Sequence, residues 1–193
     1  MEGGARGAMV NNLIFNPGDR AIHYNLIASE GRGHDVETGR LTLMANLLRH
    51  GPSTEPGTPL FVLQGQGDVE LYLAGNLAFD VRGKPVAMTD NRSRGQARIR
   101  PARSPYLPPG LPILPADQLE QALPPAVGAR PWDRDALDAQ LLADMARGVG
   151  RIIDSELENP LGYPQHAPTW RPFVEADWNL VDMRPRGGWQ ALF

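Results

Sequence analysis

The sequence contains no cysteine, no long apolar run and no excess of basic charge, and each absence removes a class of function. Without cysteine the chain has no disulfide framework, no thiolate nucleophile and no cysteine-based zinc site. No apolar stretch approaches the roughly 20 residues that a membrane-spanning helix needs. A formal net charge of −3 provides no basic field that would attract nucleic acid or an anionic membrane surface. We therefore expect neither nucleic acid nor a membrane as a partner.

Motifs of common enzyme classes are missing as well. The chain has no Gly-x-Ser-x-Gly, no phosphate-binding glycine loop and no His-Glu-x-x-His, so hydrolase and nucleotide-binding functions have no support. Lysine is nearly absent, because the 19 basic residues comprise Lys84 and 18 arginines. Guanidinium groups match carboxylates, so the arginines are one indication of anion recognition. A genomic bias towards arginine, alanine, glycine and proline is the simpler explanation of the same excess.

The chain does contain a phrase that occurs three times, in which an apolar run meets an asparagine corner and a leucine follows. The phrases span 10–15, 44–48 and 74–79, and their asparagines are 34 and 30 residues apart. Such spacings are typical of repeat architectures, and asparagine both tolerates left-handed turns and stacks in ladders. We therefore predict a parallel β-solenoid. Its equivalent corners would be Asn12, Asn46 and Asn76, followed by one interior column of Leu13, Leu47 and Leu77.

Three segments are expected along the chain. Residues 8–100 predict β-helix coils, because apolar runs alternate with clusters of Gly, Pro, Asp and Ser. Residues 101–132 predict a Pro-rich extended connection with a short helix, and 133–193 a capping helix and a packed C-terminal tail. The predicted strand regions are 8–16, 20–28, 40–48, 60–64, 68–79 and 97–99. The polar loop 31–39 is expected to project from the solenoid.

Helix signals follow the Pro-rich stretch, which we expect to lie extended along a surface. Asp117 is the expected cap of a short helix that runs through Leu123. Asp133 or Asp135 is the expected cap of a longer helix that ends at Gly148. Its apolar stripe is expected to pack against the β body and consists of Leu137, Leu141 and Met145. The aromatic residues between 163 and 178 predict that this part of the tail also packs back on the body.

Several phrases resemble a known family. Gly-Ala-Arg-Pro-Trp-Asp-Arg-Asp at 128–135 is followed by Gly-Val-Gly-Arg-Ile-Ile-Asp-Ser at 148–155 and by Gly-Tyr-Pro at 162–164. This succession is similar to the C-terminal end of bacterial pectate-lyase-like proteins, a polysaccharide lyase family, although Leu161 stands where the family has glycine. The coil phrases at 10–16 and 45–54 are similar to coils of the same family. The resemblance covers most of 8–175.

The resemblance implies an all-β fold: a right-handed parallel β-helix segment with a C-terminal α-helix and an irregular tail rich in proline and aromatic residues. It also implies β-elimination of an acidic polysaccharide such as pectate, in which calcium and other cations stabilise the developing charge and an arginine acts as the base. In the family, a His-rich coil and an Arg-Asn-Pro-Arg phrase precede the coil with which this chain begins, and this sequence contains neither. The implied protein is the C-terminal portion of a lyase, inactive alone, with its calcium site outside the chain.

Localisation and assembly follow from the same resemblance. It implies a secreted or periplasmic protein, although residues 1–7 carry no apolar core of a signal peptide. A β-helix that begins between coils exposes the backbone donors and acceptors of its first strand. Residues 8–16 are therefore expected to be covered by an upstream polypeptide or by a second copy in a homo-oligomer.

The competing interpretation is a non-catalytic β-solenoid that binds carbohydrate or has a structural role. For either function the candidate substrate-binding residues are Arg20, His23 and Tyr24, which follow a Pro-Gly turn. On an extended strand Arg20 and Tyr24 face one way, for a carboxylate and a sugar ring, and His23 faces the other. A surface strand with a solvated arginine and a half-buried tyrosine is the plainer alternative. Catalytic residues remain unassigned. No metal site is assigned either, because the polar groups at 34–37 and 154–158 are explained as solvated residues and a turn cap.

Overall fold

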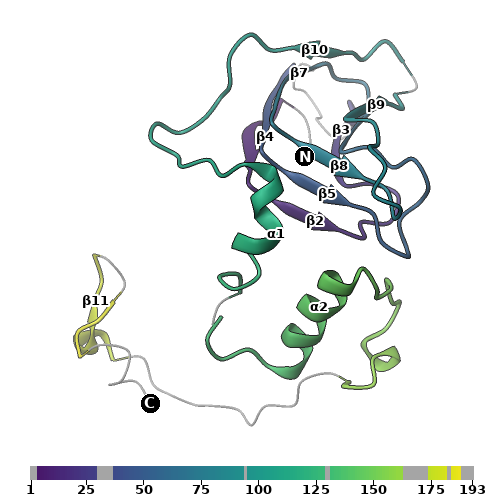
Figure 1. Cartoon of the computed structure of the whole chain (residues 1–193). Coiled ribbons are helices and arrows are strands. Elements are labelled where there is room, and N and C mark those ends of the chain that lie inside the picture. Colours follow the sequence, from purple (N-terminus) through teal and green to yellow (C-terminus); the bar gives the residue numbers. More distant parts are fainter. Residues whose placement is uncertain are drawn as a thin grey trace. The chain divides into compact units, whose positions relative to one another are not determined.

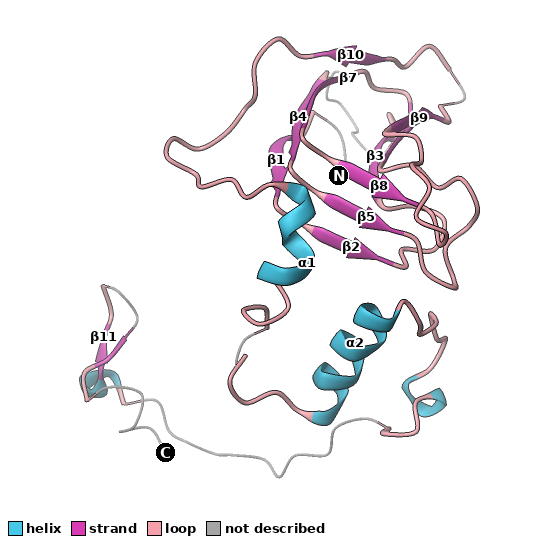
Figure 2. Ribbon diagram, in the orientation of Figure 1, coloured by secondary structure: helices cyan, strands magenta, loops and turns pink. Residues whose placement is uncertain are grey.

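The computed structural model describes residues 4–29, 37–93, 95–128, 131–162, 174–181 and 184–187. The chain divides into two compact units, Met1–Gly162 and Tyr163–Phe193. In the first unit parallel strands come first and a few helices follow (Figures 1 and 2). The strands of this unit are β1 (Arg6–Val10), β2 (Leu13–Phe15), β3 (Ile22–Leu26), β4 (Gly39–Met44), β5 (Leu47–Arg49), β6 (Phe61–Gly65), β7 (Val69–Ala74), β8 (Leu77–Phe79), β9 (Thr89–Asn91) and β10 (Ile99–Pro101).

These strands form three parallel sheets with the orders β1-β4-β7-β10, β2-β5-β8 and β3-β6-β9. Each strand pairs with the strand three places later in the chain, so each circuit of three strands stacks on the previous one. The described chain is thus mostly parallel β-sheet with few helices, an arrangement compatible with a β-helix. The predicted runs 8–16, 40–48 and 68–79 each contain two strands, because the chain turns a corner inside each run.

The asparagine corners form the expected ladder. Asn12 donates to Oδ1 of Asn46 from its backbone N and its Nδ2, at 3.0 and 2.8 Å. Asn46 donates to Oδ1 of Asn76 in the same way, at 3.0 and 2.9 Å. However, the left-handed conformation that was predicted for these asparagines is found one residue earlier in the chain. Positive φ angles of 55°, 49° and 63° belong to the preceding residues, which are Asn11, Ala45 and Gly75. The turn residue takes the strained conformation, and the next amide then points along the stack.

The leucine column stacks as predicted, but it does not lie inside the coils. Leu13, Leu47 and Leu77 are in register and belong to an outer apolar cluster with the short helix that follows the coils. The next residues along the three strands face the interior core, and they are Ile14, Leu48 and Ala78. Successive side chains of a strand point to opposite faces, so an error of one residue reverses the assignment.

The Pro-rich connection lies extended over the outer face of the β1-β4-β7 sheet, as predicted. The backbone N of Tyr106 donates to Oγ1 of Thr42 at 2.7 Å, and Thr42 is buried beneath it. The backbone N of Leu114 donates to Oδ1 of Asn11 at 2.9 Å. The prolines of the segment have no amide donor, and side-chain oxygens of Thr42 and Asn11 accept from two of its remaining amides.

The short helix begins two residues earlier than predicted. The 3₁₀-helix η1 (Ala116–Gln118) leads directly into α1 (Leu119–Ala122), and Pro115 occupies the N-cap position. Asp117 therefore lies inside the first turn and caps nothing, contrary to the prediction. Figure 1 shows α1 beside the β2-β5-β8 sheet, where Leu119 covers the outer leucine column.

The longer helix, α2 (Ala136–Arg147), has the predicted ends. Oδ1 of Asp135 accepts from the backbone N of Asp138 at 2.8 Å, and Gly148 closes the helix with φ 69°. The predicted packing of its stripe is wrong, because α2 has no buried residue and Leu141 is 59% exposed. The connection after the helix makes the contact with the coils instead, since the backbone N of Ile152 donates to Oγ of Ser53 at 3.0 Å.

The remaining described elements are short. The 3₁₀-helix η2 (Glu156–Glu158) completes the first unit, and the second unit contains η3 (Glu175–Asp177) and the antiparallel pair β11 (Trp178–Asn179) and β12 (Arg184–Pro185). The predicted packing of 163–178 and the polar loop at 31–39 fall largely outside the described residues. Within the described part, no helix has both the length and the apolar content that a membrane crossing requires.

Candidate functional site

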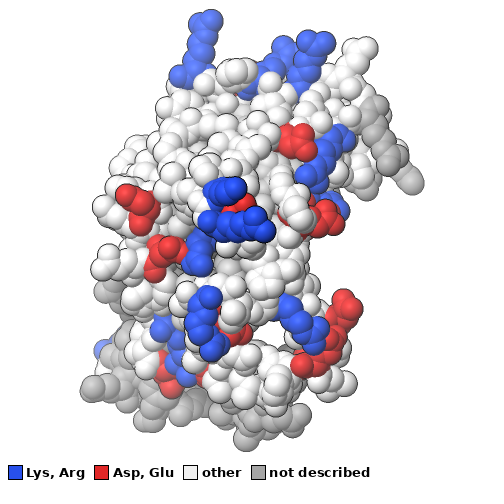
Figure 3. Space-filling view, turned by 45° about the vertical axis from the view of Figure 1, so that its right-hand side comes forward, with Lys and Arg blue, Asp and Glu red and all other residues white. Residues whose placement is uncertain are grey.

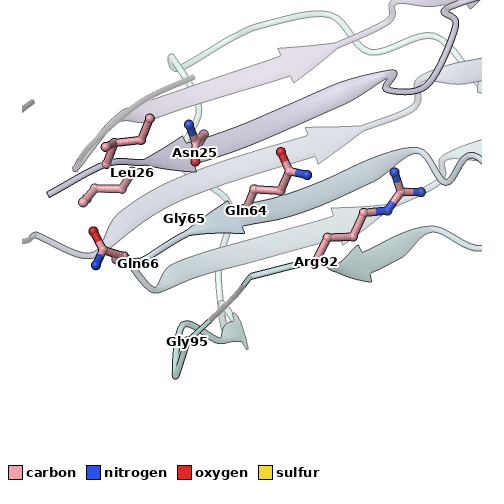
Figure 4. Close-up of a pocket in the computed structure, with 8 residues that line it drawn as sticks. Asn25, Leu26, Gln64, Gly65, Gln66, Arg92 and Gly95 are labelled. Carbon is pink, nitrogen blue, oxygen red and sulfur yellow. The ribbon is translucent and has the colours of Figure 1, made fainter. Parts of the chain in front are cut away.

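Polar side chains line up on the outer face of the β3-β6-β9 sheet. In β3, Ile22, Tyr24 and Leu26 are buried, so His23 and Asn25 point outward. Asn25 is in register with Gln64 of β6. Arg92 follows β9 directly, and its backbone N bonds the carbonyl O of Leu63 at 2.8 Å, which continues the register by one residue. Figure 4 shows the side chains of Asn25, Gln64 and Arg92 pointing to the same side from three neighbouring strands.

This row borders a hollow of about 580 Å³ (Figure 4). One end of the hollow depends on Gly65, where φ is 80° and an added Cβ would lie 2.3 Å from the carbonyl O of Leu26. Only glycine tolerates this close approach of the two coils. The backbone N of Gln66 then donates to the carbonyl O of Leu26 at 2.9 Å, and its Oε1 accepts from the backbone N of Ala28 at 3.0 Å. The polar side chains that line the hollow are three amides and one guanidinium, and Leu26 and Ile27 add apolar surface.

Two arginine–aspartate pairs belong to this region, one of them formed by Arg92 of the row. Arg20 bonds Asp19 at 2.7 Å and Arg92 bonds Asp90 at 2.8 Å. The hydrogen bond from Arg20 lowers the pKa of Asp19, and the charge of Arg92 contributes in the same direction. Figure 3 shows basic and acidic side chains next to one another at several places on the surface. Such exposed pairs contribute little to stability, so each guanidinium is available to exchange its aspartate for a carboxylate of a ligand.

His23 stands two residues before Asn25 on the same outward side of β3, and its lowered pKa leaves it neutral at pH 7. Partial burial lowers its pKa, and the positive charge of Arg20 lowers it further, while a hydrogen bond with Gln64 acts in the opposite direction. A neutral imidazole presents one donor and one acceptor. Because Nε2 of His23 is buried and the ring bonds Gln64, His23 contributes no fixed charge to the face.

Tyr24 cannot serve as the stacking surface that the sequence suggested. Its side chain is 0% exposed within the coil interior, and its hydroxyl accepts a hydrogen bond from the backbone N of Gly4 at 3.2 Å. Burial raises the pKa of Tyr24. The predicted pairing of Arg20 and Tyr24 on one face is also wrong, because β3 begins at Ile22 and the strand alternation does not extend back to Arg20.

The other polar groups considered from the sequence do not assemble into a site. At 154–158 the backbone N of Asp154 donates to Oε1 of Glu158 at 3.1 Å, and Glu158 pairs with Arg151 at 2.7 Å. Ser155 caps the short helix η2, so this segment is a capped turn. No group of three acidic, histidine or cysteine side chains in the described ranges is placed to hold a metal ion. His34 and Asp35 lie outside those ranges.

The amide and arginine partners of the row escaped sequence reasoning. Asn25, Gln64 and Arg92 belong to no motif and meet only through the register of three strands. The one signal in the sequence was the alternation that placed His23 and Asn25 on the same face of a strand.

Comparison with known proteins adds no assignment. No protein-family model matches the chain, and no curated protein and no solved structure shows a significant match. Any function of the β3-β6-β9 face is therefore argued from the arrangement of its own side chains.

Proposed function

We propose that this chain is a right-handed parallel β-helix segment of a polysaccharide-lyase-like protein, and that it binds an acidic polysaccharide on the outer face of the β3-β6-β9 sheet. The observation that carries the proposal is the row of Asn25, Gln64 and Arg92 at one level of three successive strands. The phrases that resemble pectate-lyase-like proteins provide the wider context.

The chemistry of the row suits a chain of uronic acids. Strands of a sheet are about 4.8 Å apart, so a polysaccharide that lies across them meets one polar side chain per strand. The amides of Asn25 and Gln64 both donate and accept, which matches sugar hydroxyls. Arg92 and Arg20 supply planar guanidinium groups for carboxylates. Binding then replaces the internal partners Asp90 and Asp19 by carboxylates of the ligand.

The described residues do not fit a resident calcium ion. Calcium takes six to eight oxygen ligands, whereas the two aspartates of this face are separately engaged by arginines. No cluster of three potential ligands occurs among the described side chains. The proposal therefore assigns binding to this face and routes no catalytic step through calcium.

Binding to polygalacturonate, measured by isothermal titration calorimetry, tests this assignment. Fully methyl-esterified polygalacturonate is the matched ligand, because it keeps the sugar backbone and loses the charge. We expect the protein to bind polygalacturonate and not its methyl ester. The affinity should fall about tenfold or more in the double variant Arg20→Gln, Arg92→Gln, since each charged hydrogen bond contributes about 1.5–3 kcal/mol. The exposed Arg82 provides the control variant Arg82→Gln. Equal affinity of the double variant and the parent protein would refute the proposed face.

An activity assay separates binding from catalysis. Incubation of the purified chain with polygalacturonate and calcium is expected to release no unsaturated product, followed by ultraviolet absorbance. If the absorbance increases with the parent protein and stays constant with Arg20→Gln, elimination takes place on this face.

A further inference from the structure

A second charged row crosses the outer face of the β1-β4-β7-β10 sheet. Arg6 of β1 is in register with Arg40 of β4, Arg40 with Glu70 of β7, and Glu70 with Arg100 of β10. The neighbouring positions Gly7, Leu41 and Leu71 alternate with them towards the interior, which places the four charged residues outside. The order of charges from β1 to β10 is therefore positive, positive, negative, positive.

Arg6 and Arg40 are adjacent like charges, and the acidic residue in register with Arg40, Glu70, stands on the side of Arg40 away from Arg6. Registered neighbours in a sheet have Cβ atoms about 5 Å apart, and like charges at that distance oppose each other. No ion pair joins either arginine to a described acidic residue, whereas Arg100 at the other end of the row bonds Asp68 at 2.8 Å. Glu70 is exposed and forms no ion pair with Arg40 in the described structure.

Arg40 also has unused hydrogen-bonding capacity. Its Nη2 donates to Oγ of Ser104 at 3.3 Å, which holds the guanidinium beneath the Pro-rich connection. Its Nε is buried and has no hydrogen-bond partner among the described residues. A buried donor without a partner is unfavourable, and it leaves the positive charge of Arg40 only partly compensated.

We propose that Arg6 and Arg40 form an oxyanion-binding site, distinct from the polysaccharide face, that takes a carboxylate or sulfate group. The oxyanion bridges the Nη groups of the two arginines and lies beside the hydroxyl of Ser104. The oxygens of one oxyanion accept from both guanidinium forks, and its negative charge removes their repulsion. Glu70 on the next strand limits the site to Arg6 and Arg40, because its negative charge would repel an anion bound further along the row.

The site is tested by titrating the protein with sodium sulfate, and separately with sodium acetate, against sodium chloride of equal ionic strength. The Nε–Hε resonances of the arginines report binding directly by NMR. We expect the Arg40 resonance to shift with a saturable dependence on sulfate, and the apparent affinity to fall about tenfold in Arg6→Gln. The carboxylate and sulfate titrations establish which oxyanion binds more tightly. Arg6 is exposed, so this variant tests the site without loss of packing.

Two further variants test whether binding depends on the charge of Glu70 and on the position of the arginine that is removed. Glu70→Gln should tighten sulfate binding a few-fold, because it removes a neighbouring negative charge. Arg82→Gln should leave the affinity unchanged. The proposal is overturned if the Arg40 resonance responds equally to chloride, if Arg6→Gln binds as tightly as the parent protein, or if Arg82→Gln weakens binding as much as Arg6→Gln. None of these results depends on polygalacturonate binding at the β3-β6-β9 face.

Discussion

The two segments that follow the coils, η1–α1 and α2, form an instructive contrast. Helix α1 has four residues, yet Leu119 within it is 0% exposed and packs on the outer leucine column. Glu120 adds an ion pair with Arg49 of β5. Helix α2 has twelve residues and good caps at both ends, yet none of its residues is buried. Length and capping make a helix, but a complementary apolar surface decides whether it stabilises the fold.

The contrast extends to how each segment is attached. The short helix is held by its side chains, whereas α2 is held through the connection after its C-terminus. In that connection the backbone N of Ile152 bonds Ser53, and the side chain of Ile152 lies near Gly18. The short segment is therefore part of the core, and α2 is expected to unfold locally without disturbing the coils.

The largest expected effect comes from Leu119→Ala. Truncation of this fully buried side chain uncovers the outer leucine column and should lower the free energy of unfolding by about 2–5 kcal/mol. Chemical denaturation followed by circular dichroism measures the loss. A change below about 0.5 kcal/mol would show that the coils do not need this helix and would remove the contrast.

Gly148→Ala should have the next largest effect. Gly148 has φ 69°, and alanine in this left-handed conformation costs about 1–2 kcal/mol. The strain acts at the joint between α2 and its attachment at Ile152. Amide exchange is therefore expected to accelerate in α2 and at Ile152, while the strands of the three sheets keep their protection. Faster exchange throughout the sheets would mean that α2 and the coils unfold together.

Asp135→Ala removes the N-cap of α2 and should cost about 1 kcal/mol of local helix stability. The carboxylate accepts from the backbone N of Asp138, so exchange should increase in the first turn. Asp135→Asn keeps the acceptor and is the matched control. Identical exchange in the alanine and asparagine variants would show that the cap is not what holds the first turn.

The smallest effect is expected for Leu141→Asp. The side chain is 59% exposed, so the substitution buries no charge and should change the free energy of unfolding by less than about 0.5 kcal/mol. The apolar stripe in the sequence predicted the opposite, a loss of several kcal/mol. A large decrease in the melting temperature would restore that prediction and show that α2 packs on a surface through Leu141.

Predictions from the sequence succeeded where the signal was local. The asparagine corners and both ends of α2 follow from residues that act within a few positions of themselves. Strand β9 was missed, because Thr89–Asn91 has no apolar alternation and becomes a strand only by pairing with β6. At the candidate site, alternation correctly separated His23 and Asn25 from Tyr24, but it gave the ligand-facing side to Tyr24 and could not reveal that Gln64 and Arg92 lie beside Asn25.

The sequence by itself determined where the asparagine corners lie, which segments other than β9 are extended and where α2 ends. These features depend on proline, glycine, asparagine and capping side chains acting on the adjacent backbone. The tertiary structure alone decided which of two neighbouring residues, Leu47 or Leu48, faces the core. It also decided that Tyr24 is buried, and that Arg6 stands beside Arg40. These outcomes depend on the register between strands far apart in the chain and on the surfaces available to cover each face, which no local pattern encodes.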